Sequence, residues 1–463
     1  MNYTVDSFFK KLKEKSLCFI GVGVSHRELM ELLAKKGFDI TLRDKKTREE
    51  LGELYDELKA LGIKFVLGEK YLDDFKEDII FRTPGMYYNN PKLTQARKNG
   101  KIVTSELEVF LKLCPCKTYG VTGSDGKTTT TTIISKLLEK EGKRVFLGGN
   151  IGAPLLSRIF EIKEDDVCVV ELSSFQLLSM RERLDTAVIT NISPNHLDVH
   201  GTMAEYVNAK LNIFLHQDGF GRTVLNSDCQ RTKEIEHLVR ADLLTFSLKE
   251  KQNRGAFMDE NGDLYFNDGN KKTFIMNKSE IKIPGLHNVA NYLTAICAVW
   301  GDVKIDTIRD LARSFGGVHH RIELVRELDG VRYYNDSIST TPTRLMAALS
   351  AFEDSNNILI AGGYDKKIPF EPMCGDICKK TKAVILIGET ADKIEKAIKS
   401  CEEYAVSRLM ILRADSLEDA VIKAKANARW GDRVLLSPAC ASFDMFKNFE
   451  TRGEEFTKIV KEF

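Results

Sequence analysis

The sequence has no excess of charge of either sign and no long hydrophobic run. Lys and Arg number 68 and Asp and Glu number 67, which leaves a net charge of +1 with His neutral. A protein that binds nucleic acid or an anionic membrane over a broad face needs a basic excess, so the balance argues against both. Residues 1–14 mix acidic and basic side chains, and no charge-free apolar run approaches the ~18 residues of a membrane-spanning helix. We therefore expect a cytoplasmic protein without a membrane span.

Cysteine is also scarce. Ten cysteines in 463 residues are too few for a disulfide scaffold. The closest pair, Cys114 and Cys116, flanks Pro115 and lacks the two-residue gap typical of a zinc or redox pair. The sequence thus predicts reduced, buried thiols rather than a metal or disulfide site.

Length and hydrophobic pattern predict three α/β domains in series. A chain of 463 residues corresponds to about three domains of ~150 residues. Short apolar segments alternate with helical patterns, which is typical of parallel sheets covered by helices. We place the domains at 1–112, 113–317 and 318–463. Turn-rich segments between about 250 and 285 predict hairpins added to the central domain. Strands are expected at 17–22, 39–42, 64–67, 79–82, 102–104, 118–122, 167–171, 187–191, 357–361, 383–388, 409–413 and 433–436.

The sharpest local motif is a glycine-rich loop between an apolar strand and a helical segment. The run from Gly120 to Thr128 reads GVTGSDGKT, and a helical pattern continues to Lys140. Such a loop turns backbone N–H groups and a helix N-terminus toward phosphates, and it places Lys127 at the β and γ oxygens and Thr128 near Mg²⁺. The generic pattern asks for glycine where Val121 stands. The succession of strand, glycine-rich loop and helix still predicts phosphate binding.

Three later side chains each allow two interpretations. Glu171 ends the apolar segment 167–170 and can cap the strand or hold the nucleotide's Mg²⁺. His196 follows the next strand at the same sheet edge, as an ordinary loop histidine or as part of a site. Lys210 lies in a helix that starts near Thr202, and composition alone makes it a solvated surface lysine. Residue type by itself does not separate these alternatives.

Five ordered motifs resemble the landmarks of the Mur ligases. These three-domain enzymes add amino acids to the muramoyl precursor of bacterial peptidoglycan, and folate-polyglutamate ligases share their central domain. The motifs read GSDGKT, GNIG, ELSSFQ, NHLD and GLHNVAN, and they begin at Gly123, Gly149, Glu171, Asn195 and Gly285. The resemblance covers essentially the whole chain.

A further run resembles the D-glutamate-adding branch of the family. It extends from Leu436 to Gly453 and reads LSPACASFDMFKNFETRG. The sequence Asn335-Asp336-Ser337, after His320-Arg321, fits the same branch. The implied fold is a Rossmann-like domain for a uridine diphosphate (UDP) substrate, a P-loop ATPase domain and a Rossmann-like C-terminal domain for the amino acid.

The resemblance implies an ATP site and a metal site. The matching ATP positions are Gly123, Ser124, Asp125, Gly126, Lys127, Thr128, Thr129, Asn288, Asn291, Arg321 and Asp336. Two Mg²⁺ ions are expected beside Thr128, Glu171, His196 and Lys210. In the family the lysine that matches Lys210 is carbamylated, which turns a cation into a carboxylate-like ligand. The implied catalytic residues are Lys127, Glu171, His196 and Lys210.

It also implies two substrate sites. For the UDP substrate the matching residues are Val24, Ser25, Asp44, Thr83, Pro84, Gly85, Asn150 and His196. For D-glutamate they are Thr340, Lys366, Ser442 and Phe449, which offer a cation, hydroxyls and a ring. Asp44 is equally well explained as a strand-end cap. The turn at Gly21 keeps only two glycines of the dinucleotide fingerprint, because His26 stands in the place of the third, so NAD binding is not expected.

Two features leave the assignment of residues to the amino-acid site undecided. Lys367 adjoins Lys366, so the register of the carboxylate contact is uncertain by one residue. Many relatives carry lysine after the Asn-Asp-Ser, whereas this chain has Ile338. A cation near the reacting groups is therefore absent or comes from elsewhere.

The implied activity is ATP-dependent ligation of D-glutamate to UDP-N-acetylmuramoyl-L-alanine through an acyl phosphate, in cytoplasmic peptidoglycan synthesis. ATP, Mg²⁺ and these two small substrates are the expected cofactors and partners, and we expect a monomer. Because the ATP and acceptor groups come from different domains, closure of the last domain is expected to assemble the site. The alternatives are another amino-acid ligase of the family, including the folylpolyglutamate type, and a nucleotide-binding regulator that makes no amide.

Overall fold

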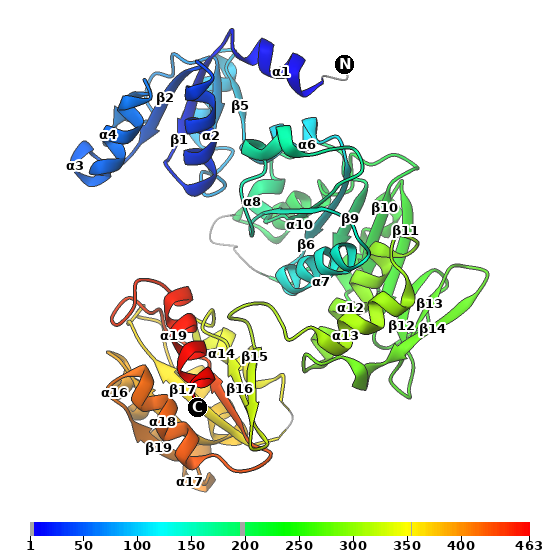
Figure 1. The fold of residues 1–463 in the computed structure, drawn as a ribbon, viewed down its shortest axis with the longest axis vertical. Coiled ribbons are helices and arrows are strands. Elements are labelled where there is room, and N and C mark those ends of the chain that lie inside the picture. The colour runs from blue at the N-terminus through cyan, green and yellow to red at the C-terminus, as the bar shows by residue number, and fades with distance from the viewer. Residues whose placement is uncertain (1–3, 195–199, 353) are drawn as a thin grey trace. The chain divides into compact units, whose positions relative to one another are not determined.

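The computed structural model describes residues 4–194, 200–352 and 354–463, without the side chains of Val24 and Ser25. The chain forms two compact units, one of residues 1–276 with 290–308 and the other of 277–289 with 309–463. Two sheets lie in the first unit and a third sheet in the second (Figure 1). The predicted α/β class is confirmed. Each sheet falls within one of the three predicted ranges, and the boundaries themselves remain a prediction.

The first sheet has five parallel strands in the order β3-β2-β1-β4-β5. Its direction of winding reverses between β1 and β4, and such a switch point is where parallel sheets of this type bind ligands. The strands are β1 (Ser16–Ile20), β2 (Asp39–Asp44), β3 (Lys64–Leu67), β4 (Ile79–Phe81) and β5 (Ile102–Thr104). The helices are α1 (Val5–Leu12), α2 (Val24–Lys35), α3 (Arg48–Leu51), α4 (Glu53–Ala60), α5 (Pro91–Lys98) and α6 (Glu106–Leu113).

The second sheet has nine strands in the order β14-β13-β12-β11-β10-β9-β6-β8-β7. The strands from β7 to β12 in this order are parallel, and β12 and β13 form an antiparallel pair, which confirms the predicted hairpin. The strands are β6 (Lys117–Thr122), β7 (Val145–Gly149), β8 (Val167–Glu171), β9 (Thr186–Ile189), β10 (Arg222–Asn226), β11 (Asp242–Ser247), β12 (Gly255–Met258), β13 (Asp263–Asn267) and β14 (Lys272–Asn277).

Helix α7 (Lys127–Lys140) packs on β6, β7 and β8. Every residue of β8 is buried, as expected for a strand covered on both faces. The other helical segments of this region are η1 (Leu156–Glu161), α8 (Ser174–Leu177), α10 (Met203–Leu211), α11 (Gln230–Glu234), η2 (Glu236–Leu238), η3 (Lys278–Glu280), α12 (Leu286–Val299) and α13 (Ile305–Ser314).

The third sheet has six strands in the order β15-β16-β20-β17-β18-β19, with β15 antiparallel to β16 and the rest parallel. The strands are β15 (Glu323–Leu328), β16 (Val331–Asn335), β17 (Asn357–Gly362), β18 (Thr381–Ile387), β19 (Met410–Arg413) and β20 (Arg433–Leu436). The helices are α14 (Pro342–Leu349), α15 (Glu371–Lys380), α16 (Ala391–Lys399), α17 (Glu402–Val406), α18 (Leu417–Asn427) and α19 (Phe449–Lys461).

Alternation along these strands builds a core on each face of the third sheet. Tyr334 and Leu359 join a cluster with residues of α14, α15 and α16. Their neighbours Tyr333 and Ile358 join a second cluster with residues of α18 and α19. Successive side chains of a strand point to opposite faces, so both faces of this sheet are covered by helices. Among the described residues, no helix is both long and apolar enough to cross a membrane.

Candidate functional site

The loop between β6 and α7 has a backbone that only glycine allows at two positions. Gly126 is the N-cap of α7 and has a φ of +78°. A Cβ on Gly126 would lie 2.5 Å from Asn291 Oδ1, and one on Gly123 would lie 1.9 Å from Thr190 Oγ1. The third glycine of the motif, Gly120, lies inside β6, where a Cβ would lie 2.4 Å from Leu184 Cδ1. Gly123 and Gly126 therefore shape the loop, and Gly120 serves packing.

Polar contacts hold this loop against the end of β9. The Asp125 N–H donates to Asn191 Oδ1 at 2.9 Å, and the Ser124 hydroxyl donates to the Ser193 carbonyl at 2.8 Å. Lys127 Nζ donates to the carbonyls of Gly123 at 3.0 Å and Ser124 at 2.9 Å, so its ammonium lies over the loop. Thr128 and Thr129 fall in the first turn of α7. This strand, glycine-rich loop and helix N-terminus together have the form of an anion-binding site.

Lys210 is buried, with 1% of its surface exposed, so the interpretation as a solvated lysine is wrong. It lies near the end of α10, and its Nζ donates to the Gly123 carbonyl at 2.8 Å and to Thr122 Oγ1 at 3.3 Å. The same Nζ lies 4.7 Å from the centre of the Tyr206 ring. Burial, followed by the nearby Lys127 ammonium, lowers the pKa of Lys210 to about 7. A large part of this amine is therefore neutral at neutral pH.

Glu171 is buried at the carboxyl end of β8, and only half of its carboxylate is paired. Oε1 accepts a hydrogen bond from Asn150 Nδ2 at 2.8 Å, whereas Oε2 is buried without a hydrogen-bond partner among the described residues. A buried oxygen of this kind is costly unless it is paired, and Mg²⁺ prefers carboxylate oxygen. Glu171 therefore fits a magnesium ligand, and Asn150 orients it. His196 falls within 195–199, outside the described residues.

The remaining predicted ATP residues lie in both units and are mostly buried. In the first unit, Asn291 Oδ1 accepts from Thr130 Oγ1 at 3.2 Å. In the second unit, Asp336 accepts from the Ser437 hydroxyl at 2.7 Å and from the Ile322 N–H at 3.2 Å, and burial raises its pKa to about 6. Asn288 donates to the Pro284 carbonyl at 2.6 Å, and Arg321 is half-buried and electrostatically favours the charged form of Asp336.

The predicted UDP residues in the region of the first sheet lie at or after the carboxyl ends of β1, β2 and β4, and Asn150 follows β7 of the second sheet. Asp44 Oδ2 accepts from the Val22 N–H at 3.0 Å, and Oδ1 accepts from the Lys46 N–H at 2.9 Å, so this carboxylate does cap the strand. The side chains of Val24 and Ser25 lie outside the described part of the chain. Thr83 lies close to the turn at Gly21, where an added Cβ would be 3.2 Å from Thr83 Cγ2.

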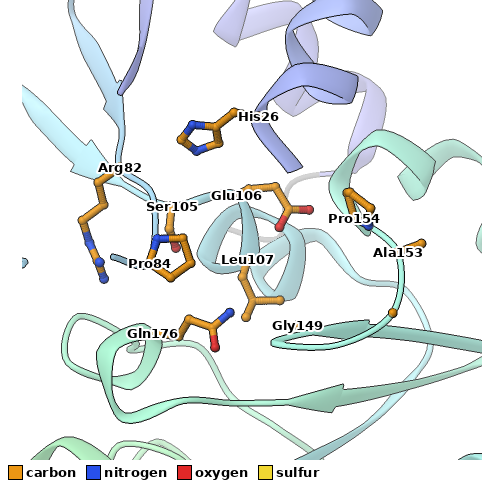
Figure 2. A pocket seen from close by; sticks show the side chains of 11 residues that line it. His26, Arg82, Pro84, Ser105, Glu106, Leu107, Gly149, Ala153, Pro154 and Gln176 are labelled. Atoms are coloured by element: carbon orange, nitrogen blue, oxygen red, sulfur yellow. The ribbon is translucent and has the colours of Figure 1, made fainter. Parts of the chain in front are cut away.

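A pocket of about 200 Å³ opens beside Pro84 in the first unit (Figure 2). Arg82, Ser105 and Glu106 line it and were not predicted as site residues, and Gln176 of the ELSSFQ motif lines it too. Arg82 is buried and donates to Ser179 Oγ at 2.6 Å, and its Nε has no hydrogen-bond partner among the described residues. Burial raises the pKa of Glu106 to about 7. Arg82 directly precedes the predicted Thr-Pro-Gly turn, and Gln176 ends the ELSSFQ motif, so both lie beside signals present in the sequence.

In the second unit, the predicted D-glutamate residues lie in the loops that follow β16, β17 and β20 and at the start of α19. Lys366 Nζ donates to Thr340 Oγ1 at 3.2 Å, which favours Lys366 over Lys367 as the contact residue. The Ser442 hydroxyl is buried and has no partner among the described residues, so it is available to a ligand. Phe449 is half-buried at the start of α19.

Two arginines in this unit were not predicted. Arg344, in the first turn of α14, donates to the Ile338 carbonyl at 3.0 Å. It also disfavours the charged form of Lys366, whose pKa is lowered by burial first and by Arg344 next. Arg452 is fully buried and donates to the carbonyls of Ser337 and Cys440 at 2.9 and 3.1 Å. Arg344 thus brings a cation to the segment where Ile338 stands in place of lysine.

Comparison with known proteins gives matches along most of the chain. The family models described as "Mur ligase middle domain" and "Mur ligase, glutamate ligase domain" match residues 121–299 and 320–440. The chain is 50% identical to the UDP-N-acetylmuramoylalanine--D-glutamate ligase of Acetivibrio thermocellus over 463 residues, 99% of each chain. It is 48% identical to that of Clostridium tetani over 462 residues, 100% of each chain.

A solved structure shares the fold at low sequence identity. The UDP-N-acetylmuramate-alanine ligase from Thermotoga maritima matches 97% of this chain and 99% of its own length, with a TM-score of 0.58 and 18% identity. This likeness concerns the fold alone.

Proposed function

The chain belongs to the Mur ligase family, and from that premise we propose that it joins D-glutamate to UDP-N-acetylmuramoyl-L-alanine while converting ATP to ADP and phosphate. The observation that carries this proposal is the set formed by Lys127, buried Lys210 and half-paired Glu171 at one edge of the central sheet. The names of the full-length relatives supply the two substrates. The enzyme would act as a cytoplasmic monomer in peptidoglycan precursor synthesis.

The chemistry requires activation of a carboxylate before an amine can attack it. In the proposed first step, the L-alanine carboxylate attacks the γ-phosphorus of ATP, the bond to the β-phosphate oxygen breaks, and ADP leaves. The D-glutamate amine, having lost a proton to solvent or a base, then attacks the acyl carbon. The tetrahedral species expels phosphate, and the amine loses its second hydrogen as a proton. The products are the amide, ADP and phosphate.

The loop amides and Lys127 are suited to hold the phosphates. Lys127 Nζ donates to two carbonyl oxygens of the loop, and turning outward would bring its charge to the γ-phosphate. Thr128, Glu171, carbamylated Lys210 and His196 would hold two Mg²⁺ ions. When bound, these ions would neutralise charge on the transferred phosphoryl group.

Carbamylation of Lys210 is the part of this proposal that departs most from ordinary lysine chemistry. The neutral amine adds to CO₂, a C–N bond forms, and one proton leaves to solvent, which yields a carbamate anion. A lysine with a pKa near ~10.4 is almost wholly protonated at neutral pH, whereas Lys210, with a pKa of about 7, has the reactive form in quantity. Its burial beside the phosphate loop supports the proposal that the new anion serves as a metal ligand there.

Cations in the second unit would receive the amino-acid substrate. Lys366 and Arg344 offer two positive groups, and Thr340 and Ser442 offer hydroxyls, which suits a substrate with two carboxylates. We assign to Arg344 the charge that lysine supplies in relatives at the position of Ile338. The Phe449 ring would form one wall of the site.

The test of the proposed function is phosphate release from ATP with UDP-N-acetylmuramoyl-L-alanine and a panel of D- and L-amino acids. Of the amino acids in the panel, only D-glutamate should stimulate phosphate release, and the amount of amide formed should equal the amount of phosphate released. Stimulation by a different amino acid would assign another ligase of the family. ATP hydrolysis that ignores both acceptors would favour a nucleotide-binding regulator.

A further inference from the structure

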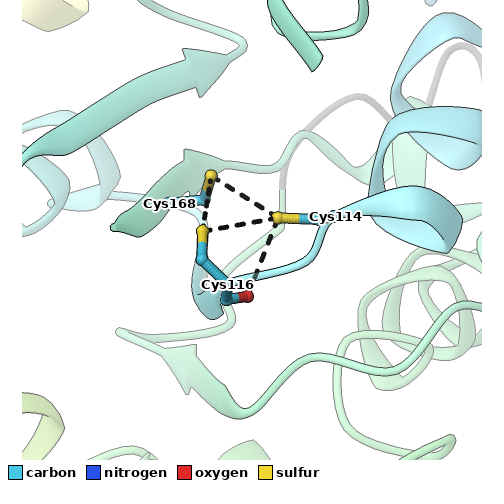
Figure 3. Close-up of side chains that lie close together, drawn as sticks. All are labelled: Cys114, Cys116 and Cys168. Carbon is cyan, nitrogen blue, oxygen red and sulfur yellow. Dashed lines mark hydrogen bonds between the residues drawn. The ribbon is translucent and has the colours of Figure 1, made fainter. Parts of the chain in front are cut away.

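Three cysteines converge in the first unit, away from the phosphate loop (Figure 3). Cys114 is the C-cap of α6, Cys116 immediately precedes β6, and Cys168 is the second residue of β8. Their Sγ atoms lie 3.7 Å apart for Cys114 and Cys116, 3.6 Å for Cys114 and Cys168, and 3.5 Å for Cys116 and Cys168. The three thiols have no part in the proposed ligase reaction, and no motif in the sequence contains all of them.

The strand register explains how Cys168 reaches the pair. Strands β6 and β8 are parallel neighbours, and Cys168 is opposite Thr118, two residues beyond Cys116. Pro115 lies between the other two cysteines and turns the chain as it leaves α6. The spacing of Cys114 and Cys116 argues against a metal site, but the third thiol comes from more than fifty residues away in the chain, so no local pattern contains it.

We propose that Cys114, Cys116 and Cys168 form a binding site for a thiophilic d¹⁰ cation, with Zn²⁺ as the ion it takes. A tetrahedral zinc site with Zn–S bonds of 2.3 Å has sulfur atoms about 3.8 Å apart. All three observed separations are within about 0.3 Å of that value, so binding requires little movement. A disulfide would instead draw two sulfurs together to about 2.05 Å and leave the third unused.

The site is also accessible. Cys114 is half-buried, and Cys114 and Cys116 line an open pocket together with Lys117, Asp185 and Arg222. Three buried thiols that serve only as small apolar side chains would need no such opening. Binding would release three protons to solvent, as three thiols become thiolates, and the fourth position on the ion would face the pocket.

Asp185 is not expected to be the fourth ligand. Its Oδ2 accepts hydrogen bonds from the Thr118 N–H at 2.8 Å and the Thr118 hydroxyl at 2.9 Å, and its Oδ1 pairs with the Arg183 guanidinium at 3.5 Å. Solvent would therefore occupy the fourth position. Sulfur ligands favour zinc over magnesium, which prefers oxygen, so millimolar Mg²⁺ should not compete.

The test is titration of the reduced, metal-free full-length protein with Zn²⁺ against a chromophoric chelator, with Co²⁺ as a spectroscopic probe. We expect one ion per chain, a thiolate-to-cobalt charge-transfer band, and no competition from excess Mg²⁺. Cys168→Ala and Cys114→Ala should each weaken binding at least tenfold. Cys229→Ala, which removes a thiol of the same unit outside the cluster, should bind like the parent.

Cys114→Ala decides the question if Cys168→Ala does not fold, because Cys114 is half-buried at a helix end. Equal Zn²⁺ affinity in Cys114→Ala and the parent would overturn the proposal. Failure of the parent to compete with the chelator would overturn it too. A mass loss of two hydrogens under mild oxidation that is absent in Cys114→Ala, with no metal binding by the parent, would overturn the zinc site in favour of a disulfide pair.

Discussion

The two ends of strands β6 and β8 carry different kinds of side chain. At their carboxyl ends lie the glycine-rich loop, the half-paired Glu171 carboxylate and the Lys210 amine. At their amino ends lie three thiols. Oxygen and amine-derived ligands suit Mg²⁺ and phosphate, whereas sulfur suits softer cations. One pair of neighbouring strands can thus present hard ligands at one edge of a sheet and soft ligands at the other.

The difference follows from how the chain enters and leaves parallel strands. At the carboxyl end, β6 passes through a loop into the N-terminus of α7, whose unpaired N–H groups attract anions. At the amino end, the C-terminus of α6 leads into β6, and this helix end offers carbonyls rather than N–H groups. Anion chemistry is therefore favoured at one edge only, and a cation is better accommodated at the other.

The largest effect is expected from Lys210→Ala at the carboxyl edge. If carbamylated Lys210 is a metal ligand, this variant should be nearly inactive, and acetate or formate should restore part of the activity by taking the vacated ligand position. The measurement is turnover with and without the carboxylate at fixed Mg²⁺. Full activity without the carboxylate would contradict the assignment.

Lys117→Ala is the matched control for that variant at the opposite end of β6. Lys117 forms a half-exposed ion pair with Asp302, with Nζ 2.8 Å from the carboxylate oxygens. Its removal should leave turnover near normal and cost at most about 1 kcal/mol of stability. A large loss of turnover in this variant would remove the contrast between the two edges.

Lys127→Ala should reduce turnover by about 10²-fold, the usual cost of losing one group that stabilises transition-state charge. The protein should remain folded, since Lys127 Nζ contacts loop carbonyls rather than a core. Circular dichroism and steady-state kinetics with D-glutamate would measure both properties. Near-normal kcat in a folded variant would exclude this loop from the reaction.

Sequence alone predicted the central site better than its surroundings. The glycine-rich loop and the segment that became β8 carry their signal within a few adjacent residues, and both were located to within two residues. Burial of Lys210 could not be predicted from composition, because it depends on the contact with Gly123, which lies 87 residues away in the chain. The resemblance to a family, rather than spacing, pointed to it.

Contacts between distant segments account for the features that were missed. Cys168 joins Cys114 through the register of two strands, and Arg82 reaches Ser179 from another sheet. The contact of Arg344 with Ile338 spans only six residues, but most of the chain between them is irregular and carries no periodic pattern. A single sequence carries no record of such pairings, whereas periodicity within an element does survive in it.

The stability of the first unit should depend on pH through Lys210. The unfolded lysine has a pKa near ~10.4 and the folded one about 7, so between these values unfolding takes up a proton and stability rises with pH. Below pH 7 Lys210 is charged in both the folded and the unfolded protein. The parent then bears the full cost of burying that charge, up to about 5 kcal/mol. Lys210→Met should therefore raise the midpoint of thermal unfolding at pH 6 more than at pH 9.5, in CO₂-free buffer. An equal change at both pH values would contradict the lowered pKa.

The smallest expected effect is that of zinc at the amino edge on catalysis at the carboxyl edge. The five residue steps of β6 from Lys117 to Thr122 span about 17 Å, and the Debye length at physiological ionic strength is about 8 Å. Even without screening, a unit charge at 17 Å in water changes an energy by about 0.2 kcal/mol, which is less than twofold in a rate. With excess Mg²⁺, saturating the thiol site should therefore leave kcat and the KM for ATP unchanged within about twofold. A larger change in the parent that disappears in Cys168→Ala would mean that β6 and β8 transmit a structural shift from the thiols to Glu171, since direct electrostatics is too weak to do so.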